Sequence, residues 1–406
     1  MNKKKIINDP VYGFINIYDE IIYDLIEAPY FQRLRRIKQL GLTHYVYPGA
    51  THTRFHHSLG AIHLMQLTID IIRSKGHEIT SEEARAAKIA ILLHDLGHGP
   101  LSHTLENVLI DGYSHEQLSL LLMHELNKKF YGELSLAIEI FTGKYKKRFL
   151  HQLVSSQLDV DRLDYLRRDS FYTGVSEGII GSDRIIKMLN VHNDQLVIEA
   201  KGIHSIEKFL IARWIMYWQV YFHKTVISAE QLITNIIKRA KELIYKGEEL
   251  TCTPVMKYFL TEQYKIDNEK NLLLNFAQLD DSDIAVSIKN WANHDDYVLS
   301  NLCKKMYNRK LYKIELQNEP FDTKLVENFK EQIQNQDNIK DEDIHYFVFS
   351  SNLTNKAYSA LDDKIQIIDK NDEVTDVAEA SDMLNLSVLS KIVKKYFLCY
   401  PKENNI

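Results

Sequence analysis

The sequence predicts a mainly helical protein with a small α/β region at its C-terminal end. Stretches with a helical spacing of apolar residues, several of them opened by capping sequences, recur between residues 18 and 307. Strand-like runs are confined to the first 17 residues, to about 191–200 and to the part after residue 310. We therefore expect a helical domain over 1–309, with its core in about 30–225, and a small α/β subdomain over 310–406.

Composition excludes several classes of protein. The 406 residues are 45% hydrophobic, which is enough to bury a large core, and the net charge of −5 offers no broad basic surface for nucleic acid or an anionic membrane. The basic run at 144–148 is explained more simply as a solvated helix start, so a nucleic-acid partner is not indicated. Three distant cysteines fit a reducing cytoplasm, and no run reaches the ~18 apolar residues of a membrane span.

The first 41 residues contain a hairpin and two short helices. Pro10 and Gly13 separate two β-branched runs, which predicts a hairpin over 5–17. Helices are expected at 18–26 and 31–40, separated by Pro29 and ended by Gly41. Within 31–40 every third residue is apolar, and cations cover the remaining face, where they are solvated or meet phosphate.

The next segments carry the polar residues of interest. We expect a long helix over 56–75, with His57 in its first turn, and a helix opened by the capping box at 80–83 that ends at His94 and Asp95. Gly97 and Gly99 stop that helix, and Pro100 suits the first turn of the following one. A second capping box at 114–117 opens a helix to about 127, and further helices follow at 149–156 and 159–169.

The remaining elements are a hairpin at 191–200, a helix over 203–245, and helices near 254–263, 283–292 and 295–307. After residue 310 we expect strands at 313–316, 344–349 and 364–368, with a helix at 324–334.

Four residues from three predicted helices form a candidate metal site: His57, His94, Asp95 and Asp161. Eleven of the 17 histidines fall between His44 and His124, which makes ordinary surface polarity a poor explanation for this group. Two imidazoles and two carboxylates suit a divalent ion such as Mn, Fe, Zn or Ni, with Mg also open, and leave coordination positions for water and a phosphate oxygen. Any one of these residues alone would more simply be structural, for instance as a helix-start carboxylate.

Four motifs occur in the order and register that resemble the HD-domain phosphohydrolases. They are Arg54-Phe-His-His57-Ser58-Leu-Gly60, His94-Asp95-Leu-Gly-His98-Gly-Pro-Leu-Ser-His103, Ser114-His115-Glu116-Gln117 and Asp159-Val-Asp161-Arg162-Leu-Asp164-Tyr165. The flanking residues at 31–35 and 39–41 are similar to the corresponding residues of one branch of this family, the deoxynucleoside triphosphate triphosphohydrolases. The likeness extends from about residue 6 to about residue 224.

The resemblance implies a helical enzyme that releases a deoxynucleoside and triphosphate when water attacks the α-phosphorus. His57, His94, Asp95 and Asp161 would be the metal ligands. His103 would act at the α-phosphate with His98 nearby, and Glu106 with His115 would form a carboxylate–histidine relay. The family position of Glu106 is usually Asp, so the relay has a longer arm here. A homo-oligomer, either a dimer or a tetramer, is also implied.

Substrate contacts follow from the same position matching. Arg54, Arg162 and Arg213 would hold phosphates, with Arg162 standing where the family often has Lys. Gln39 and Asp169 would bind the sugar 3'-hydroxyl, whereas Leu40 and Tyr221 would crowd its 2' edge. Tyr165 would back the sugar-phosphate, and Tyr217 stands where relatives carry His. Without the upstream motifs, an aromatic core would explain the 213, 217 and 221 stripe equally well.

Five positions match an activating-nucleotide site in regulated members of the family: Lys5, Asn8, Glu27, Gln32 and Arg35. Helix-surface charge explains Gln32 and Arg35 equally well.

Two other functional classes compete with this interpretation. One is a different HD-type chemistry, either a nucleotide phosphatase or a phosphodiesterase. The other is a non-catalytic module that binds nucleotides or single-stranded nucleic acid. The complete ligand set argues against the second class, and analysis of reaction products separates the enzymes.

Overall fold

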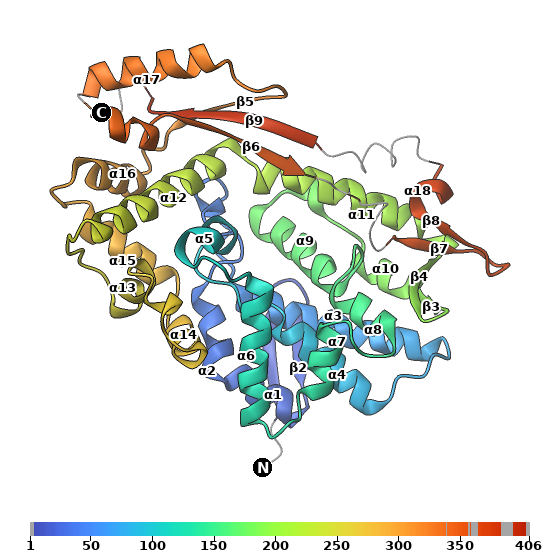
Figure 1. Ribbon diagram of the computed structural model, residues 1–406. Helices are drawn as coiled ribbons and strands as arrows, with labels where there is room; N and C mark the ends of the chain where they lie inside the picture. The colour runs from blue at the N-terminus through green and yellow to red at the C-terminus, as the bar shows by residue number, and fades with distance from the viewer. Residues whose placement is uncertain (1–3, 338, 356–357, 359–363, 383–392, 403–406) are drawn as a thin grey trace.

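The computed structural model describes residues 4–337, 339–355, 358, 364–382 and 393–402, and it confirms a mainly helical fold. Figure 1 shows the N-terminus at one end of the helical body and a sheet, with α17 (Thr323–Asp337) beside it, at the opposite end. Within these residues, every helix falls short of the length or the continuous apolarity that crossing a bilayer demands.

The N-terminal hairpin is confirmed. Strands β1 (Lys5–Asp9) and β2 (Gly13–Ile17) pair antiparallel, and α1 (Glu20–Glu27) follows them, capped by the Asp19 side chain. The single helix predicted over 31–40 is wrong. The chain forms only one α-helical turn, α2 (Pro29–Gln32), tightens into a 3₁₀ helix (Arg33–Arg36) and becomes extended at Ile37.

Arg33 differs from the surface cation that the sequence predicted. It is 1% exposed, and its guanidinium donates hydrogen bonds to the carbonyl oxygens of Leu279 (2.8 Å), Leu96 (3.1 Å) and His98 (2.7 Å). Burial lowers the pKa of Arg33 to about 9. Because three carbonyl groups converge on this side chain, Arg33 ties the loop around His98 to the body of the protein.

Four helices build the core around the site: α3 (Arg54–Ser74), α4 (Ser81–Leu93), α6 (His115–Lys129) and α9 (Val160–Thr173). Both predicted capping boxes form, since Thr80 and Ser114 accept hydrogen bonds from backbone groups three residues later. Helix α5 (Ser102–Leu109) begins two residues after Pro100 rather than at it, because Leu101 adopts a left-handed conformation with φ 48°.

The smaller helices surround this core. Those predicted at 149–156, 254–263, 283–292 and 295–307 are confirmed as α8 (Arg148–Val154), α13 (Pro254–Leu260), α15 (Asp281–Trp291) and α16 (Tyr297–Tyr307). Four others were not predicted: α7 (Ser135–Phe141), α10 (Ser182–Met188), α14 (Glu269–Phe276) and α18 (Val377–Ala380).

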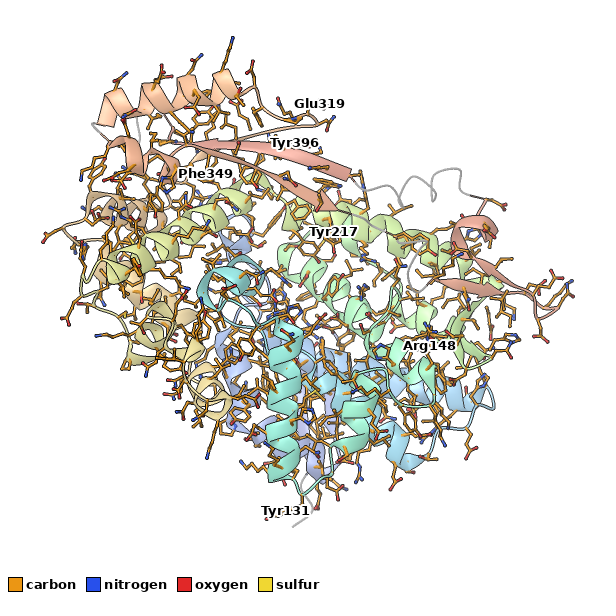
Figure 2. The ribbon with its side chains drawn as sticks, viewed as in Figure 1. Tyr131, Arg148, Tyr217, Glu319, Phe349 and Tyr396 are labelled. Atoms are coloured by element: carbon orange, nitrogen blue, oxygen red, sulfur yellow. The ribbon has the colours of Figure 1, made fainter. Side chains whose placement is uncertain are left out.

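The long helix predicted over 203–245 is interrupted. It consists of α11 (Ile203–Met216), a π-helical turn (Tyr217–Tyr221) and α12 (Lys224–Tyr245), which begins after the capping side chain of His223. Figure 2 shows Tyr217 beneath the strands on which Phe349 and Tyr396 are labelled. Single π turns inside helices are frequent at functional sites because the extra residue changes which side chains face inward.

The strands form two further sheets. The predicted hairpin, β3 (Leu189–His192) and β4 (Gln195–Glu199), is confirmed and is extended by β7 (Gln366–Ile368), parallel to β4, and by β8 (Val374–Asp376). The other sheet has the order β5 (Lys313–Gln317), β9 (Val393–Tyr400) and β6 (Phe349–Asn355).

The strand predicted at 344–349 is wrong, because 341–346 form a 3₁₀ helix whose Asp343 pairs with Arg239 at 3.0 Å. Strands β8 and β9 were not predicted. Because β7 joins a sheet begun at residue 189, the C-terminal region contacts the helical body through strand pairing. The domain boundary near residue 310 stays a prediction.

Candidate metal centre and cavity

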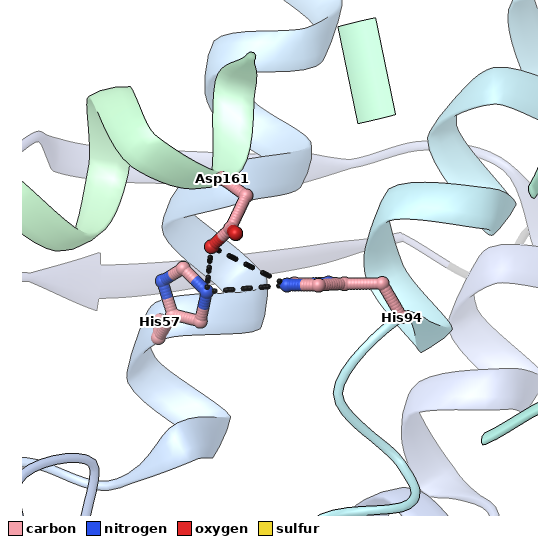
Figure 3. Close-up of side chains that lie close together, drawn as sticks. All are labelled: His57, His94 and Asp161. Carbon is pink, nitrogen blue, oxygen red and sulfur yellow. Dashed lines mark hydrogen bonds and ion pairs between the residues drawn. The ribbon is translucent and has the colours of Figure 1, made fainter. Parts of the chain in front are cut away.

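Three of the four predicted ligands converge on one point. The Nε2 atoms of His57 and His94 lie 3.4 Å apart, and Asp161 Oδ1 lies 3.0 Å from the first and 3.5 Å from the second. Figure 3 shows them approaching from α3, from the end of α4 and from the start of α9. One potential ligand atom from each residue falls within 4.8 Å of the others, so this group could hold a divalent ion.

The hydrogen bonds of the two imidazoles show what kind of species fits between them. His94 Nδ1 is 2.6 Å from the Ile91 carbonyl oxygen, and His57 Nδ1 is 2.7 Å from Asp164 Oδ2. A carbonyl and a carboxylate only accept hydrogen bonds, so both Nδ1 atoms donate and both neutral rings direct an Nε2 lone pair toward Asp161. Three acceptors around one point require positive charge there, which a divalent cation supplies.

Protons can supply the same charge. Burial alone would lower the pKa of His57, but hydrogen bonds from its ring to Asp161 and Asp164 raise it to about 10. The same imidazoles depress the pKa of Asp161 far below its usual range, against the effect of burial. The two imidazoles and the Asp161 carboxylate together therefore favour a positive charge between them, either a proton or a metal ion.

A buried ion-pair chain supports His57 from behind. Asp164 accepts hydrogen bonds from Arg168 Nε at 2.9 Å and Nη2 at 3.1 Å, and Arg168 Nη1 reaches Asp9 at 2.7 Å. Asp164 and Arg168 are both 0% exposed. Gly60 makes room for the pair, since a Cβ atom there would lie 1.9 Å from Asp164 Oδ1. The orientation of His57 therefore depends on residues that lie outside the ligand set.

Asp95 joins this centre to Arg54 and His98. Its carboxylate lies 3.2 Å from His94 Nε2, 3.8 Å from His57 Nε2 and 3.2 Å from His98 Nε2, and it accepts a 2.7 Å hydrogen bond from Arg54. Burial opposes ionisation of Asp95, but His94 and Arg54 hold its pKa well below the usual range. Its role as a fourth ligand stays a prediction.

The predicted catalytic histidines lie next to one another. The rings of His98 and His115 stack with centroids 4.1 Å apart, and His103 meets each at an edge. Glu106 Oε1 accepts hydrogen bonds from both the Nδ1 and the backbone nitrogen of His115, each at 2.8 Å, so the longer Glu arm still reaches its partner. Although the His103 ring is exposed to the cavity, desolvation and then the Arg54 charge lower its pKa to about 4.

A cavity of about 930 Å³ connects these groups with most of the predicted substrate contacts. Its walls include the metal-centre and catalytic residues His94, Asp95, His98, His103, His115 and Asp161. They also include the predicted substrate residues Gln39, Leu40, Arg54, Arg162, Tyr165, Asp169, Tyr217 and Tyr221. His57 and Glu106 do not line the cavity, but His57 contacts Asp161 and Glu106 contacts His115, which do. Arg213 is 7% exposed and does not line the cavity, but its charge acts on Tyr165.

Hydrogen bonds fix the predicted sugar-binding side of the cavity. Asp169 accepts one from His52 at 2.8 Å and one from the Tyr221 hydroxyl at 2.8 Å. The π turn brings Tyr221 to this position and packs its ring 5.3 Å from that of Tyr217. The buried Gln39 Oε1 has no hydrogen-bond partner within the described part of the chain, so it is free to accept one.

The five candidates for an activating-nucleotide site lie apart from the cavity lining. Lys5 pairs with Glu27, Arg35 Nε donates to Gln32 at 2.8 Å, and Asn8 is exposed on β1. These contacts are ordinary surface interactions, and nucleotide binding here stays a prediction.

Several residues of the site were not assigned a role from the sequence. His52, Asp164, Arg168 and Gly60 act through contacts between distant segments. Asp164 and Arg168 share a helical face with Asp161, a periodicity visible in the sequence, but their partner His57 comes from another helix.

We expect Asp164→Asn to weaken metal binding by about 10- to 100-fold, because the amide no longer fixes the ring orientation and basicity of His57. Titration of the metal-free protein with Mn²⁺ measures the change. Asp9→Asn is the matched control, since it also takes a carboxylate from Arg168 but does not touch His57. Equal losses of affinity in both variants would show that general destabilisation is the cause.

Comparison with known proteins relates this chain to one family. Residues 54–169 match the HD domain, and residues 180–258 match the HD associated region. The chain is 38% identical over 317 residues to YwfO of Bacillus subtilis, covering 77% of this chain and 72% of YwfO. The deoxynucleoside triphosphate triphosphohydrolase SAMHD1 homolog of Dictyostelium discoideum is 33% identical over 265 residues, covering 61% of this chain and 51% of the relative.

The crystal structure of a phosphohydrolase from Bacteroides thetaiotaomicron has a TM-score of 0.94 and 53% sequence identity. The match covers 98% of this chain and 100% of that one.

Proposed function

Because the chain belongs to the HD-domain phosphohydrolases, we propose that it hydrolyses deoxynucleoside triphosphates to a deoxynucleoside and triphosphate. The observation that carries the proposal is the shared cavity, which is lined by two of the three candidate metal ligands, by Arg54 and Arg162, and by the hydrogen-bonded Asp169–Tyr221 pair. Its volume, about 930 Å³, lies in the range of small-molecule sites. The Dictyostelium relative, named as a deoxynucleoside triphosphate triphosphohydrolase, supports the same substrate class.

The chain's own residues divide the work of such a reaction. A bound divalent ion, whether Mn, Fe, Zn, Ni or Mg, would activate water and neutralise phosphate charge. Arg162 and Arg54 would bind phosphate oxygens, and Gln39 with Asp169 would orient the 3'-hydroxyl. Tyr221, held by Asp169, and Leu40 would leave no room for a 2'-hydroxyl.

The histidines would handle protons. His103 stays neutral near pH 7 because its pKa is about 4, so it can exchange a proton with a group at the α-phosphate. Glu106 would fix the tautomer of His115 by accepting from its Nδ1 atom. A homo-oligomer and an activating nucleotide, both implied by the family resemblance, remain predictions.

The test is to incubate the purified protein with each dNTP and each rNTP, with Mn²⁺ or Mg²⁺, and to resolve the products by ion exchange. We expect tripolyphosphate and deoxynucleoside from dNTPs, and little product from rNTPs. Chelation by EDTA should abolish turnover, and added metal should restore it, because the lone pairs of His57, His94 and Asp161 need a cation. Inorganic phosphate released from monophosphates would instead support a phosphatase, and binding without turnover would support a non-catalytic module.

A further inference from the structure

Helix α12 presents a polar face to the cavity that the proposed reaction does not use. Glu230, Gln231 and Thr234 line the wall and are partly buried. Burial raises the pKa of Glu230 to about 7, against a smaller lowering by the Thr104 side chain. No cation pairs with Glu230 among the described residues. A carboxyl group can make several hydrogen bonds, so this one keeps capacity for a ligand.

The packing of α12 places this face beside two other parts of the cavity wall. The helix contacts α5, which carries His103 and Thr104, and also the 3₁₀ turn Thr43–Tyr45 that follows Leu40. The phosphates of a nucleotide are drawn to the arginines and the metal centre, whereas an acidic Glu230 repels them. The base is therefore the part of a dNTP that Glu230 can bind.

We propose that Glu230 selects the base of the substrate by accepting a hydrogen bond from an exocyclic amino group. The inference rests on the proposed dNTP hydrolysis. Cytosine presents an amino group at position 4, whereas uracil presents a carbonyl oxygen there. Above its pKa of about 7, Glu230 is a carboxylate that accepts from the former but faces a second acceptor in the latter, and burying two unpaired acceptors against each other is costly.

The pair dCTP and dUTP isolates this contact, because their bases differ only along that edge. At about pH 8.5, where Glu230 is ionised and cannot donate to the uracil oxygen, we expect wild-type protein to favour dCTP over dUTP by on the order of 10- to 100-fold in kcat/KM. Glu230→Gln keeps the shape of the side chain and adds an amide that can donate to the uracil oxygen. It should bring the ratio to within about 3-fold of unity or invert it. Thr234→Val, on the same helix face, should keep the wild-type ratio.

Binding is measured separately from turnover, with the α,β-imido analogues of dCTP and dUTP, Mn²⁺ and isothermal titration calorimetry. If no dNTP is hydrolysed, the proposed function fails, while the ratio of the two analogue affinities still decides base selection. A ratio near unity for the wild type, a ratio that Glu230→Gln leaves unchanged, or no binding of either analogue would overturn the inference even if dNTPs are hydrolysed. A wild-type preference for the cytosine analogue that the variant removes would support it.

Discussion

Asp161→Ala is expected to lower kcat with the best dNTP by on the order of 1,000-fold, because several kcal/mol of charge stabilisation depends on the bound metal. Asp161 supplies the only carboxylate oxygen in the described His57–His94–Asp161 group. Without it, the two imidazoles, whose Nε2 atoms lie 3.4 Å apart, lose the nearer of the two carboxylates described beside them, and Asp95 is left to offset a divalent ion. Metal content by inductively coupled plasma mass spectrometry should fall in parallel with the rate.

The matched control is Asp183→Ala. Asp183 also lies in the first turn of a helix, α10, so both variants lose a favourable interaction with the helix dipole, worth about 0.3–1 kcal/mol. The Asp183 side chain is exposed, and its ion pair, with Arg167 Nη1 at 3.4 Å, is longer than the contact of Asp161 with His57. Asp183→Ala should keep the metal and the rate. If Asp161→Ala keeps its metal and a rate within about 3-fold of wild type, the assignment of this centre is wrong.

Gly97→Ala is expected to destabilise the fold by about 3 kcal/mol and to abolish most activity, because it pushes α6 away from the site. A Cβ atom at Gly97 would lie 1.9 Å from the His115 carbonyl oxygen and 2.4 Å from the Ser119 nitrogen. Both are backbone atoms of the helix that carries the His115 imidazole, so no side-chain rotation relieves the clash. The Gly97 nitrogen also donates to Ser119 Oγ at 2.8 Å, which holds the two segments together.

Denaturant unfolding measures this effect, with Gly181→Ala as the control. Gly181 has open space where a Cβ would be and a negative φ of −86°, so its replacement should change stability by less than about 1 kcal/mol. A Gly97→Ala protein as stable as the Gly181→Ala protein would show that α6 can move without cost.

The sequence predicted those features whose signals lie within a few residues of one another. The capping boxes at Thr80 and Ser114, the hairpin around Pro10 and most helix positions were predicted correctly, because each depends on local hydrogen bonds or on periodicity. The helix over 31–40 was wrong for the opposite reason. Its pattern was helical, but the buried Arg33 donates hydrogen bonds to the carbonyl groups of residues 96, 98 and 279. No local pattern reveals these distant partners.

The same division holds for the candidate site. Residue type and motif order identified His57, His94, Asp95 and Asp161, since metal-binding chemistry resides in the side chains themselves. Tertiary structure alone decided that three of them converge within 4.8 Å and that Arg213 lies off the cavity. It also showed the supporting chain from Asp9 through Arg168 to Asp164, and Glu230 on the remaining wall.

The sequence by itself thus determined the mainly helical class and the chemical identity of the candidate ligands. Only the packing of α3, α4, α9 and α12 decided which side chains face one another, where the π turn places Tyr221, and how close α6 comes to Gly97. The physical reason is that a contact between residues of different helices depends on how whole helices pack, whereas capping and periodicity act within one or two turns.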